Sequence, residues 1–406
     1  MNILMLSSTF PYPPTKGRKQ LRTFHLLKQL SKNNSVTLVS QPAEDVAEEE
    51  IEYLEEQVEQ LVTFSPPTAS DNLGILDKAK RLGTFIQQGI APQILDKYSP
   101  IIQEWLDHAF ANGQFDVISC QDSNDEIYIR PQWREQKGIV LDLHISESGK
   151  YKQQLDPKTP EKDQFNLGWL RRYEQNYLEK FSAIVTLTSI DRRLLKELNP
   201  ESQIFVIPNG VNLTHFSRRI TNQGGQRLVF FGKMDNAANI DAACFLASEI
   251  FPAIRQRYPE ATLELVGANP SREVLALDSL AGVRVTGEVT SVLEYLHWAT
   301  VCVIPIRKRI GLTNRTLEAM AAGVPVVGSD RALAGLEVDG SNVLLRAMRA
   351  NTVEEYVYAI GRLFSEPKLR EKLSENGRFL VESEYTWEKV GQKYEQVLFE
   401  ACQQST

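Results

Sequence analysis

Residues 304–327 hold the side chains best suited to chemistry in this sequence. An apolar stretch runs into a turn that carries Arg307, Lys308 and Arg309, and a short helical pattern follows and ends at Gly323. Unpaired backbone N–H groups at the start of a helix attract phosphate oxygens, and basic side chains beside them add formal positive charge. The segment therefore predicts a phosphate-binding turn.

Glu318 lies one to two turns into the helix expected at residues 313–322. Its carboxylate can accept hydrogen bonds from sugar hydroxyls. Phosphate donors followed by one carboxylate indicate a site for a nucleotide with a ribose. Basic runs are also common on solvated surfaces, so this segment by itself fits an ordinary strand-turn-helix-strand unit equally well.

The elements that would position these residues alternate along the whole chain. Strands are expected at 2–7, 35–40, 117–120, 139–143, 183–187, 203–207, 227–231, 262–266, 283–286, 301–306, 324–328 and 342–345. Helices are expected at 19–32, 48–60, 72–88, 100–111, 169–181, 189–197, 240–258, 272–280, 292–299, 313–322, 352–365 and 367–382. This alternation predicts an α/β protein with mostly parallel sheets.

A Pro-Asn-Gly turn at 208–210 and a polar run at 217–225 divide the pattern into two units of domain size. We expect two Rossmann-like, doubly wound domains that face each other across a cleft. Ligands of such folds bind outside the carboxyl ends of the strands.

Composition narrows the class of protein. The 406 residues are 42% hydrophobic and 24% charged, which is ordinary for a soluble globular enzyme, and the net charge of −7 argues against nucleic-acid binding. No membrane span or secretion signal is expected. The four cysteines are widely separated and indicate free thiols in a reducing, cytoplasmic location rather than a disulfide framework or a zinc site.

Six basic residues and no acidic residue precede Glu44; the six are Lys16, Arg18, Lys19, Arg22, Lys28 and Lys32. Most lie in or beside the helix expected at 19–32, whose apolar face carries Leu21, Phe24, Leu27 and Leu30. This helix either packs on its own sheet with a solvated basic face or docks on an anionic membrane, as a peripheral protein would.

Several further motifs occur in order along the second half of the chain. They are Val-Ile-Pro-Asn-Gly-Val-Asn at 206–212, Phe-Phe-Gly-Lys-Met-Asp at 230–235, Leu-Val-Gly at 265–267, Val-Thr-Gly-Glu-Val at 285–289 and Tyr-Thr-Trp at 385–387. With residues 311–327, this ordered set resembles the family-four (group 1) retaining glycosyltransferases of the GT-B fold. The chain is most similar to the sugar-transferase subgroup associated with exopolysaccharide systems, and its first 200 residues resemble the family more weakly.

The resemblance implies three parts. An acceptor-side domain would span residues 1–208, a nucleotide-sugar donor domain 209–384, and a final helix at 385–406 would pack back on the first domain. The implied enzyme is a retaining hexosyltransferase-type glycosyltransferase. It would move a sugar from a nucleoside-diphosphate sugar to a hydroxyl of a glycan or a lipid-linked acceptor, without a cofactor or a metal.

The resemblance also implies roles for particular residues. Glu318 would bind the ribose hydroxyls, and Lys233, Arg307 and Arg315 would contact the diphosphate. Further donor contacts are expected from Gly17, Arg18, Gly232, Gly287, Val289, Gly311, Leu312, Thr313 and Asn314. His144, after the strand at 139–143, is either a contact to the donor sugar or acceptor or a structural histidine. The acidic run at 122–126 is expected to be a loop rather than a metal site.

Three positions depart from the family pattern. Ile310 replaces a glutamate eight residues before Glu318, Lys233 replaces an arginine, and Asn239 replaces a lysine six residues later. Two alternatives therefore stay open: a nucleotide-sugar epimerase of the same fold, and a non-catalytic nucleotide-sugar-binding protein. The first would release free sugar without an acceptor, and the second would bind diphosphate without transfer.

Overall fold

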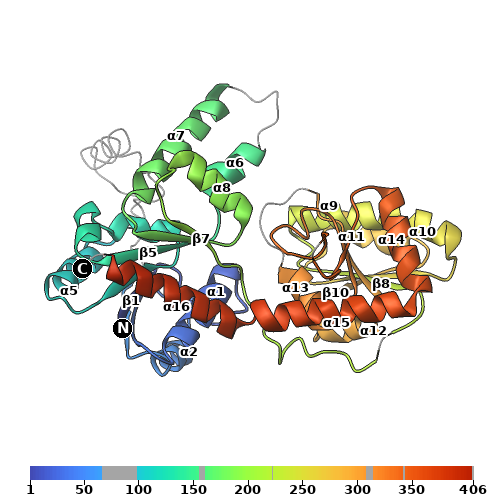
Figure 1. Cartoon of the computed structure of the whole chain (residues 1–406), viewed down its shortest axis with the longest axis horizontal. Helices are drawn as coiled ribbons and strands as arrows, with labels where there is room; N and C mark the ends of the chain where they lie inside the picture. The colour runs from blue at the N-terminus through green and yellow to red at the C-terminus, as the bar shows by residue number, and fades with distance from the viewer. Residues whose placement is uncertain (66–97, 155–160, 222, 308–313, 342, 405–406) are drawn as a thin grey trace. The chain divides into compact units, whose positions relative to one another are not determined.

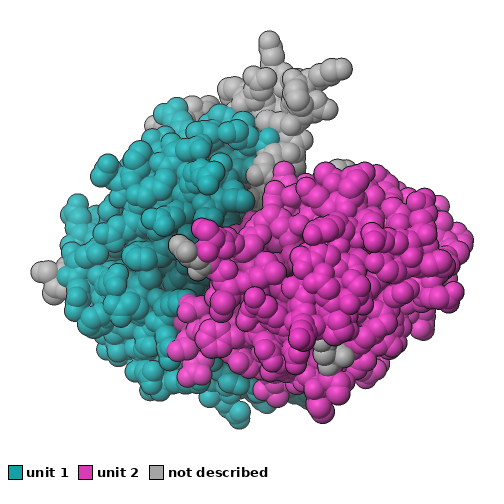
Figure 2. Space-filling view, turned by 45° about the vertical axis from the view of Figure 1, so that its right-hand side comes forward, with its two compact units in different colours: residues 1–208, 390–406 teal, residues 209–389 magenta. Residues whose placement is uncertain are grey.

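A computed structural model of the chain describes residues 1–65, 98–154, 161–221, 223–307, 314–341 and 343–404. The chain divides into two compact units, coloured separately in Figure 2. Unit 1 comprises Met1–Pro208 and Val390–Thr406, and unit 2 comprises Asn209–Lys389.

Unit 1 is built on a parallel sheet. Within its described residues the strands are β1 (Asn2–Ser7), β2 (Ser35–Ser40), β3 (Gln60–Thr63), β4 (Val117–Cys120), β5 (Gly138–Leu143), β6 (Ala183–Thr186) and β7 (Ile204–Val206), in the order β3-β2-β1-β4-β5-β6-β7. In β1, β4 and β5 almost every residue is buried. Continuous burial explains why these strands read as unbroken apolar runs, because helices cover both faces of a parallel sheet.

The helices of unit 1 surround this sheet (Figure 1). They are α1 (Arg18–Leu30), α2 (Glu48–Glu55), α5 (Pro100–Ala111), α6 (Glu147–Gln154), α7 (Glu161–Leu178), α8 (Ser189–Leu198) and the larger part of α16 (Trp387–Gln403). Two 3₁₀ helices, η1 (Ser123–Tyr128) and η2 (Pro131–Glu135), follow β4.

Helix α16 packs closely on unit 1 through two glycines. A Cβ atom on Gly391 would lie 2.4 Å from Cβ of Gln29 in α1, and one on Gly138 would lie 2.6 Å from the backbone of Ala401. The hydroxyl of Tyr394 also hydrogen-bonds to the Ser119 hydroxyl of β4 at 2.8 Å, in a buried position. The end of the chain is therefore part of the core of unit 1.

Unit 2 repeats the same design. Its described strands are β8 (Arg227–Phe231), β9 (Thr262–Val266), β10 (Val283–Gly287), β11 (Val301–Ile304), β12 (Val326–Gly328) and β13 (Met348–Arg349), in the parallel order β10-β9-β8-β11-β12-β13. Its helices are α9 (Ala237–Phe245), the π-helical η3 (Leu246–Ile250), α10 (Phe251–Arg257), α11 (Arg272–Ala276), the 3₁₀ helix η4 (Leu277–Ser279), α12 (Val292–Trp298), α13 (Asn314–Ala321), α14 (Val353–Ser365) and α15 (Pro367–Glu384). The two parallel α/β units confirm the doubly wound fold.

The continuous helix Ala237–Arg257 is long and apolar enough to cross a membrane by length and hydropathy. Its residues Leu246, Ile250 and Ile254 are each fully buried and belong to the hydrophobic core of unit 2. The apolar composition of this helix is thus explained by its place against the sheet.

Two expected elements differ from the structure. Residues 60–63 form β3 rather than the end of a helix from 48 to 60, because parallel pairing of Leu61 with Leu38 replaces local helix propensity. The last strand of unit 2 lies at Met348–Arg349 and pairs with Val327 and Gly328, so the strand expected at 342–345 is wrong. Helix α6 was not expected from the sequence.

Strand order reverses direction once in each unit. The reversal falls between β1 and β4 in unit 1 and between β8 and β11 in unit 2. Loops after these strand pairs leave in opposite directions, so a crevice for a ligand forms at that point. Gly17 and Arg18 follow β1, Gly232 and Lys233 follow β8, and Arg307, Arg315 and Glu318 follow β11, whereas His144 follows β5 and Gly287 ends β10.

Candidate nucleotide-diphosphate site and acceptor-side edge

Arg315 lies in the first turn of α13, the helix that follows β11. Its side chain is buried with 7% of the residue exposed, and Nη2 donates a hydrogen bond of 2.9 Å to Oδ1 of Asn239. Nδ2 of the same amide donates to the backbone oxygen of Lys233 at 2.7 Å. The guanidinium carbon lies 5.1 Å from the ring centre of Phe230 in β8. The loop after β8 and the helix after β11 are therefore joined at the reversal point of the sheet.

Gly232 provides the space for this arginine. A Cβ atom on Gly232 would lie 2.6 Å from Nη2 of Arg315, and its φ of 151° is one that residues with side chains rarely adopt. Gly267 after β9 is equally restricted, because its Cβ would lie 1.9 Å from the carbonyl oxygen of Gly232. The two glycines let the backbone segments after β8 and β9 and the Arg315 guanidinium meet in one place.

Glu318 lies on the same helix, close to one turn after Arg315, and is partly exposed. Both side chains act on the buried Cys302 thiol of β11: burial raises its pKa to about 12, Arg315 opposes this and Glu318 adds to it. The cation and the carboxylate therefore share one electrostatic environment at the end of the sheet. This is the combination expected for a diphosphate linked to a ribose.

Arg307, at the end of the segment after β11, has a different setting. It forms a two-point ion pair with Asp241 of α9, with N···O distances of 3.0 and 3.1 Å, and its guanidinium lies 4.1 Å from the ring centre of Phe245. Lys233 is exposed, and its backbone oxygen rather than its ammonium group bonds to Asn239. Arg315 thus packs against Gly232, whereas Arg307 is paired with Asp241.

The remaining donor-side residues are distributed around this point. Asn314 begins α13 and accepts a hydrogen bond of 3.2 Å from Nδ2 of Asn209. Gly287 ends β10 with φ of 69°, and its oxygen accepts from the N–H of Gly267 at 3.1 Å. Val289, two residues after Gly287, is half-buried. Gly311, Leu312, Thr313 and Ile310 lie outside the described residues.

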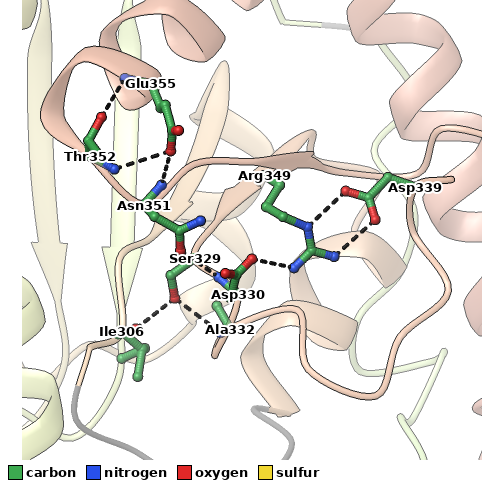
Figure 3. Close-up of polar contacts among 9 residues, drawn as sticks. All are labelled: Ile306, Ser329, Asp330, Ala332, Asp339, Arg349, Asn351, Thr352 and Glu355. Atoms are coloured by element: carbon green, nitrogen blue, oxygen red, sulfur yellow. Dashed lines mark hydrogen bonds and ion pairs between the residues drawn. The ribbon is translucent and has the colours of Figure 1, made fainter.

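A polar network after β12 fixes the strand ends beside this site (Figure 3). Oγ of Ser329 donates to the oxygen of Ile306 at 2.6 Å and accepts from the N–H of Ala332 at 3.1 Å. Arg349 bridges Asp330 and Asp339 with distances of 2.8 and 2.9 Å. The oxygen of Ala332 accepts from Thr316 of α13 at 2.8 Å. The network therefore connects the exit of β11 to the start of α13.

On unit 1, His144 directly follows β5. Burial lowers the pKa of its imidazole, with the Asp142 carboxylate opposing that shift, so the ring is neutral at pH 7. Its Nε2 atom is buried and has no hydrogen-bond partner among the described residues. Glu174 of α7 holds the following turn by accepting from the N–H of Glu147 at 2.7 Å and from the Ser146 hydroxyl at 3.0 Å.

The basic N-terminal helix is less exposed than its sequence indicates. Arg22 and Asp142 form a two-point ion pair of 2.6 and 2.9 Å, and both side chains are fully buried. The interpretation of Arg22 as part of a solvated basic face is wrong, because the facing strand β5 supplies a carboxylate. Lys16 pairs with Asp45 at 3.3 Å, and Lys19 pairs with Asp122.

The acidic run at 122–126, expected to be a loop, begins the 3₁₀ helix η1, and its carboxylates are buried. Asp122 caps η1, Asp125 is fully buried, and Glu126 is 1% exposed. Asp125 accepts from the N–H and hydroxyl of Ser8, and burial together with Asp122 raises its pKa to about 7. Glu126 accepts from Lys180 at 2.6 Å. These carboxylates therefore cap η1 and hold together the segments after β1 and β4, at the reversal point of unit 1.

Gly17 and Arg18 lie where α1 begins, in the connection after β1. Gly17 precedes the first helical residue in extended backbone, and Arg18 is exposed. Among the described residues, no group of three or more His, Cys, Asp or Glu side chains is arranged to hold a metal ion. None of the four cysteines forms a disulfide in the structure.

Asn239 and the network of Figure 3 were not found as site elements from the sequence. Asn239 could be recognised only as a substitution at a family lysine position. Its bridging role depends on which groups the fold brings within 3 Å. The residues of the network are spread from 306 to 355 and form no local motif.

Two family models match the sequence. Residues 21–215 match the family described as Glycosyltransferase Family 4, and residues 225–366 match the family described as Glycosyl transferases group 1. The first match lies almost wholly in unit 1 and the second lies in unit 2. The order and division of the two matches follow the two sheets.

Several solved structures share the fold over nearly the whole chain. They include sucrose-phosphate synthase from Thermosynechococcus elongatus, with a TM-score of 0.67, 16% identity and 100% of each chain covered. Alr3699/HepE from Anabaena in complex with UDP has a TM-score of 0.64 and 14% identity, with 98% of this chain and 100% of that chain covered. A point mutant of TarM from S. aureus, in complex with Fondaparinux, α-GlcNAc-glycerol and UDP, has a TM-score of 0.62 and 12% identity, with 98% and 99% covered.

At these identities the likeness to solved structures concerns the fold, and the family assignment comes from the two sequence matches. The chain is a family-four glycosyltransferase of the GT-B fold, with a Glycosyltransferase Family 4 region followed by a group 1 glycosyl transferase region.

Proposed function

We propose that this protein transfers a sugar from a nucleoside-diphosphate sugar to a hydroxyl of a glycan or glycolipid acceptor, with retention at the anomeric carbon. Unit 2 binds the donor, and unit 1 supplies the acceptor side. The proposal keeps the cytoplasmic location that free thiols favour.

The arrangement around Arg315 carries this proposal. A buried guanidinium, held by Asn239 and seated against Gly232, lies on the same helix as Glu318 at the reversal point of the sheet. Arginine suits phosphate because its planar N–H groups can bind two oxygens at once. A carboxylate one turn further suits vicinal ribose hydroxyls, which donate hydrogen bonds.

The neighbours support the same class of donor. The Anabaena protein Alr3699/HepE has been solved with UDP and with UDP-glucose, and the TarM mutant with UDP and a GlcNAc-glycerol. We therefore favour a hexose or N-acetylhexosamine carried on a nucleoside diphosphate.

In the proposed reaction, the bond from the anomeric carbon to the diphosphate breaks while the acceptor oxygen approaches from the same face. The leaving phosphate oxygen takes the acceptor proton. Arg315, with Lys233, stabilises the negative charge that grows on the diphosphate, so the proposal requires no metal. His144 is neutral, so its imidazole either donates a hydrogen bond to a sugar hydroxyl on the acceptor side or accepts one from it.

The test has two parts. A ligand that binds the folded state raises the melting temperature, so UDP, GDP and their sugars are screened first by thermal shift. The donor that binds is then incubated with and without glycan and glycolipid acceptors, and the products are separated. A glycoside with the donor's anomeric configuration supports the proposal. An inverted glycoside refutes retention, and free sugar formed without any acceptor indicates the epimerase alternative.

A further inference from the structure

We propose that Asn239 is a positioning residue that fixes the Arg315 guanidinium for contact with the donor diphosphate, an inference that rests on the proposed function. Asn239 is 2% exposed and lies in the first turn of α9. Asn239 lies on α9 and Arg315 lies on α13, so the contact between them is a tertiary one.

The chemistry of the partners determines how this amide is oriented. Arg315 can only donate, so the atom at 2.9 Å from Nη2 must be the amide oxygen of Asn239. The backbone oxygen of Lys233 can only accept, so the atom at 2.7 Å from it must be the amide nitrogen. One neutral side chain thus connects the loop after β8 to the guanidinium through both of its polar atoms.

Three contacts together leave Arg315 little freedom. The Phe230 ring lies under the guanidinium at 5.1 Å, Gly232 lies against Nη2 where no Cβ would fit, and Asn239 accepts from that same nitrogen. A planar guanidinium binds two phosphate oxygens only when its plane and direction match them. Fixing both in advance removes the entropy that a free arginine would lose on binding.

The exchange at position 239 gives this contact a specific consequence. The resemblance places a lysine here in relatives, and a lysine ammonium has donors but no acceptor. It could not accept from Arg315, and it would put a second positive charge at contact distance from the first. In relatives with a lysine at this position, the positive charge near the diphosphate is that of the lysine. In this chain Arg315 supplies the charge, and the Asn239 amide acts only by holding Arg315.

The experiment measures binding of UDP, GDP, uridine and guanosine to the full-length protein by calorimetry. Asn239→Ala, the isosteric Asn239→Asp, Arg315→Ala and the double variant Asn239→Ala/Arg315→Ala are compared with wild type. Asn376→Ala is the matched control, because Nδ2 of Asn376 also donates to a backbone oxygen of unit 2, that of Leu345 at 2.8 Å. Melting temperatures are recorded for every variant.

We expect Asn239→Ala to weaken binding of the preferred diphosphate by about tenfold, the typical loss for a hydrogen bond to a charged group, and to leave nucleoside binding unchanged. Asn239→Asp should weaken diphosphate binding further, because its carboxylate neutralises Arg315. In the Arg315→Ala background, Asn239→Ala should add no further loss. Asn376→Ala should change neither ligand's affinity.

Other outcomes overturn the proposal in distinguishable ways. Equal losses for nucleoside and diphosphate, or losses that add fully in the double variant, would show that Asn239 only supports the fold. Wild-type affinity in Asn239→Ala with binding lost in Arg315→Ala would remove the positioning role and leave the donor site intact. A wild-type protein that binds neither UDP nor GDP would remove both this inference and the proposed function.

Discussion

Arg22 of α1 and Asp142 of β5 form a two-point ion pair in which neither side chain has any exposed surface. Asp142 is two residues before His144, so the pair fixes the strand end that presents the histidine. Nη1 of Arg22 also donates to the oxygen of Pro208 at 3.2 Å, the last residue of this part of unit 1. One side chain therefore stabilises both the end of β5, which carries His144, and the exit of the chain from unit 1.

Removing one member of this pair should strongly destabilise the protein. Asp142→Asn leaves the buried charge of Arg22 uncompensated, and Arg22→Ala leaves the buried Asp142 carboxylate without its hydrogen-bond donors. We expect either variant to lower the free energy of unfolding by about 3–5 kcal/mol. Urea unfolding measures it. Arg362→Ala is the control, since its pair with Glu366 is exposed to solvent and should contribute little to stability. Equal effects in the two pairs would contradict the buried role of Arg22.

Glu318→Ala should abolish most donor affinity without unfolding the chain. The residue is partly exposed on α13, so truncation leaves little cavity, while the ribose would lose its acceptor. We expect a loss of about tenfold to a hundredfold in nucleotide affinity, as for hydrogen bonds to a charged group. Calorimetry with the preferred nucleotide and melting curves check the two parts separately. Unchanged affinity would remove Glu318 from the site.

Gly232→Ala should affect both stability and donor binding. Its Cβ would lie 2.6 Å from Nη2 of Arg315, and the backbone φ of 151° adds strain of about 1–3 kcal/mol. Gly335→Ala provides the control, because that glycine has φ of 81° but no atom within 4 Å of its would-be Cβ. Both variants should lower the melting temperature, and only Gly232→Ala should lose diphosphate affinity. If both retain full affinity, Arg315 does not bind the diphosphate.

His144 should make stability depend on pH in a defined direction. Burial lowers its folded pKa below the unfolded value of about 6.5, so the unfolded state binds more protons just below that pH. The contribution is complete above about pH 6.5 and is lost as the pH falls toward the folded pKa. His25, whose pKa burial lowers to about 4, acts in the same direction. The difference between wild type and His144→Gln therefore isolates His144.

Thermal or urea unfolding from about pH 5 to 8 measures this difference, and proton NMR of the imidazole gives the folded pKa directly. A His144 resonance that titrates above about pH 6.5 would contradict the buried, neutral assignment.

Binding to membranes by charge alone should be weak. Of the six early basic residues, Lys16, Lys19 and Arg22 are paired with carboxylates of later elements. These carboxylates offset part of the positive charge around α1 that the sequence of residues 1–43 indicates. We expect equal flotation with neutral vesicles and with vesicles containing anionic lipid. A clear, salt-sensitive preference for the anionic vesicles would instead restore the membrane-docking interpretation.

Most strands and helices were predictable because their signals are local. Buried runs such as Ile3–Leu6 and amphipathic helices such as α14 carry their pattern in consecutive residues. β3 was not predictable in the same way, because its Gln-Leu-Val-Thr sequence becomes a strand only through pairing with β2. The run at 122–126 was expected to be a loop and forms the start of η1 instead, because its carboxylates have partners distant in sequence, such as Ser8 and Lys180.

The candidate site was predictable in its residue types and only partly in its contacts. Gly232 lies against Arg315 and Glu318 lies on the same helix, whereas Arg307 pairs with Asp241; donor binding by these residues stays a prediction. No sequence pattern distinguishes an arginine destined for a ligand from one held by an aspartate on the neighbouring helix. That difference depends on side-chain distances of a few ångströms.

Unit 2 is one uninterrupted stretch of chain, whereas unit 1 is assembled from the first 208 residues and the last 17. Synthesis from the ribosome therefore finishes the second sheet before the first can receive helix α16, with its glycine contacts at Gly391 and Gly138. A nascent chain must hold unit 1 with an uncovered flank until helix α16 has been synthesised. Deletion of α16 would consequently damage unit 1, whose other elements all precede unit 2 in the chain.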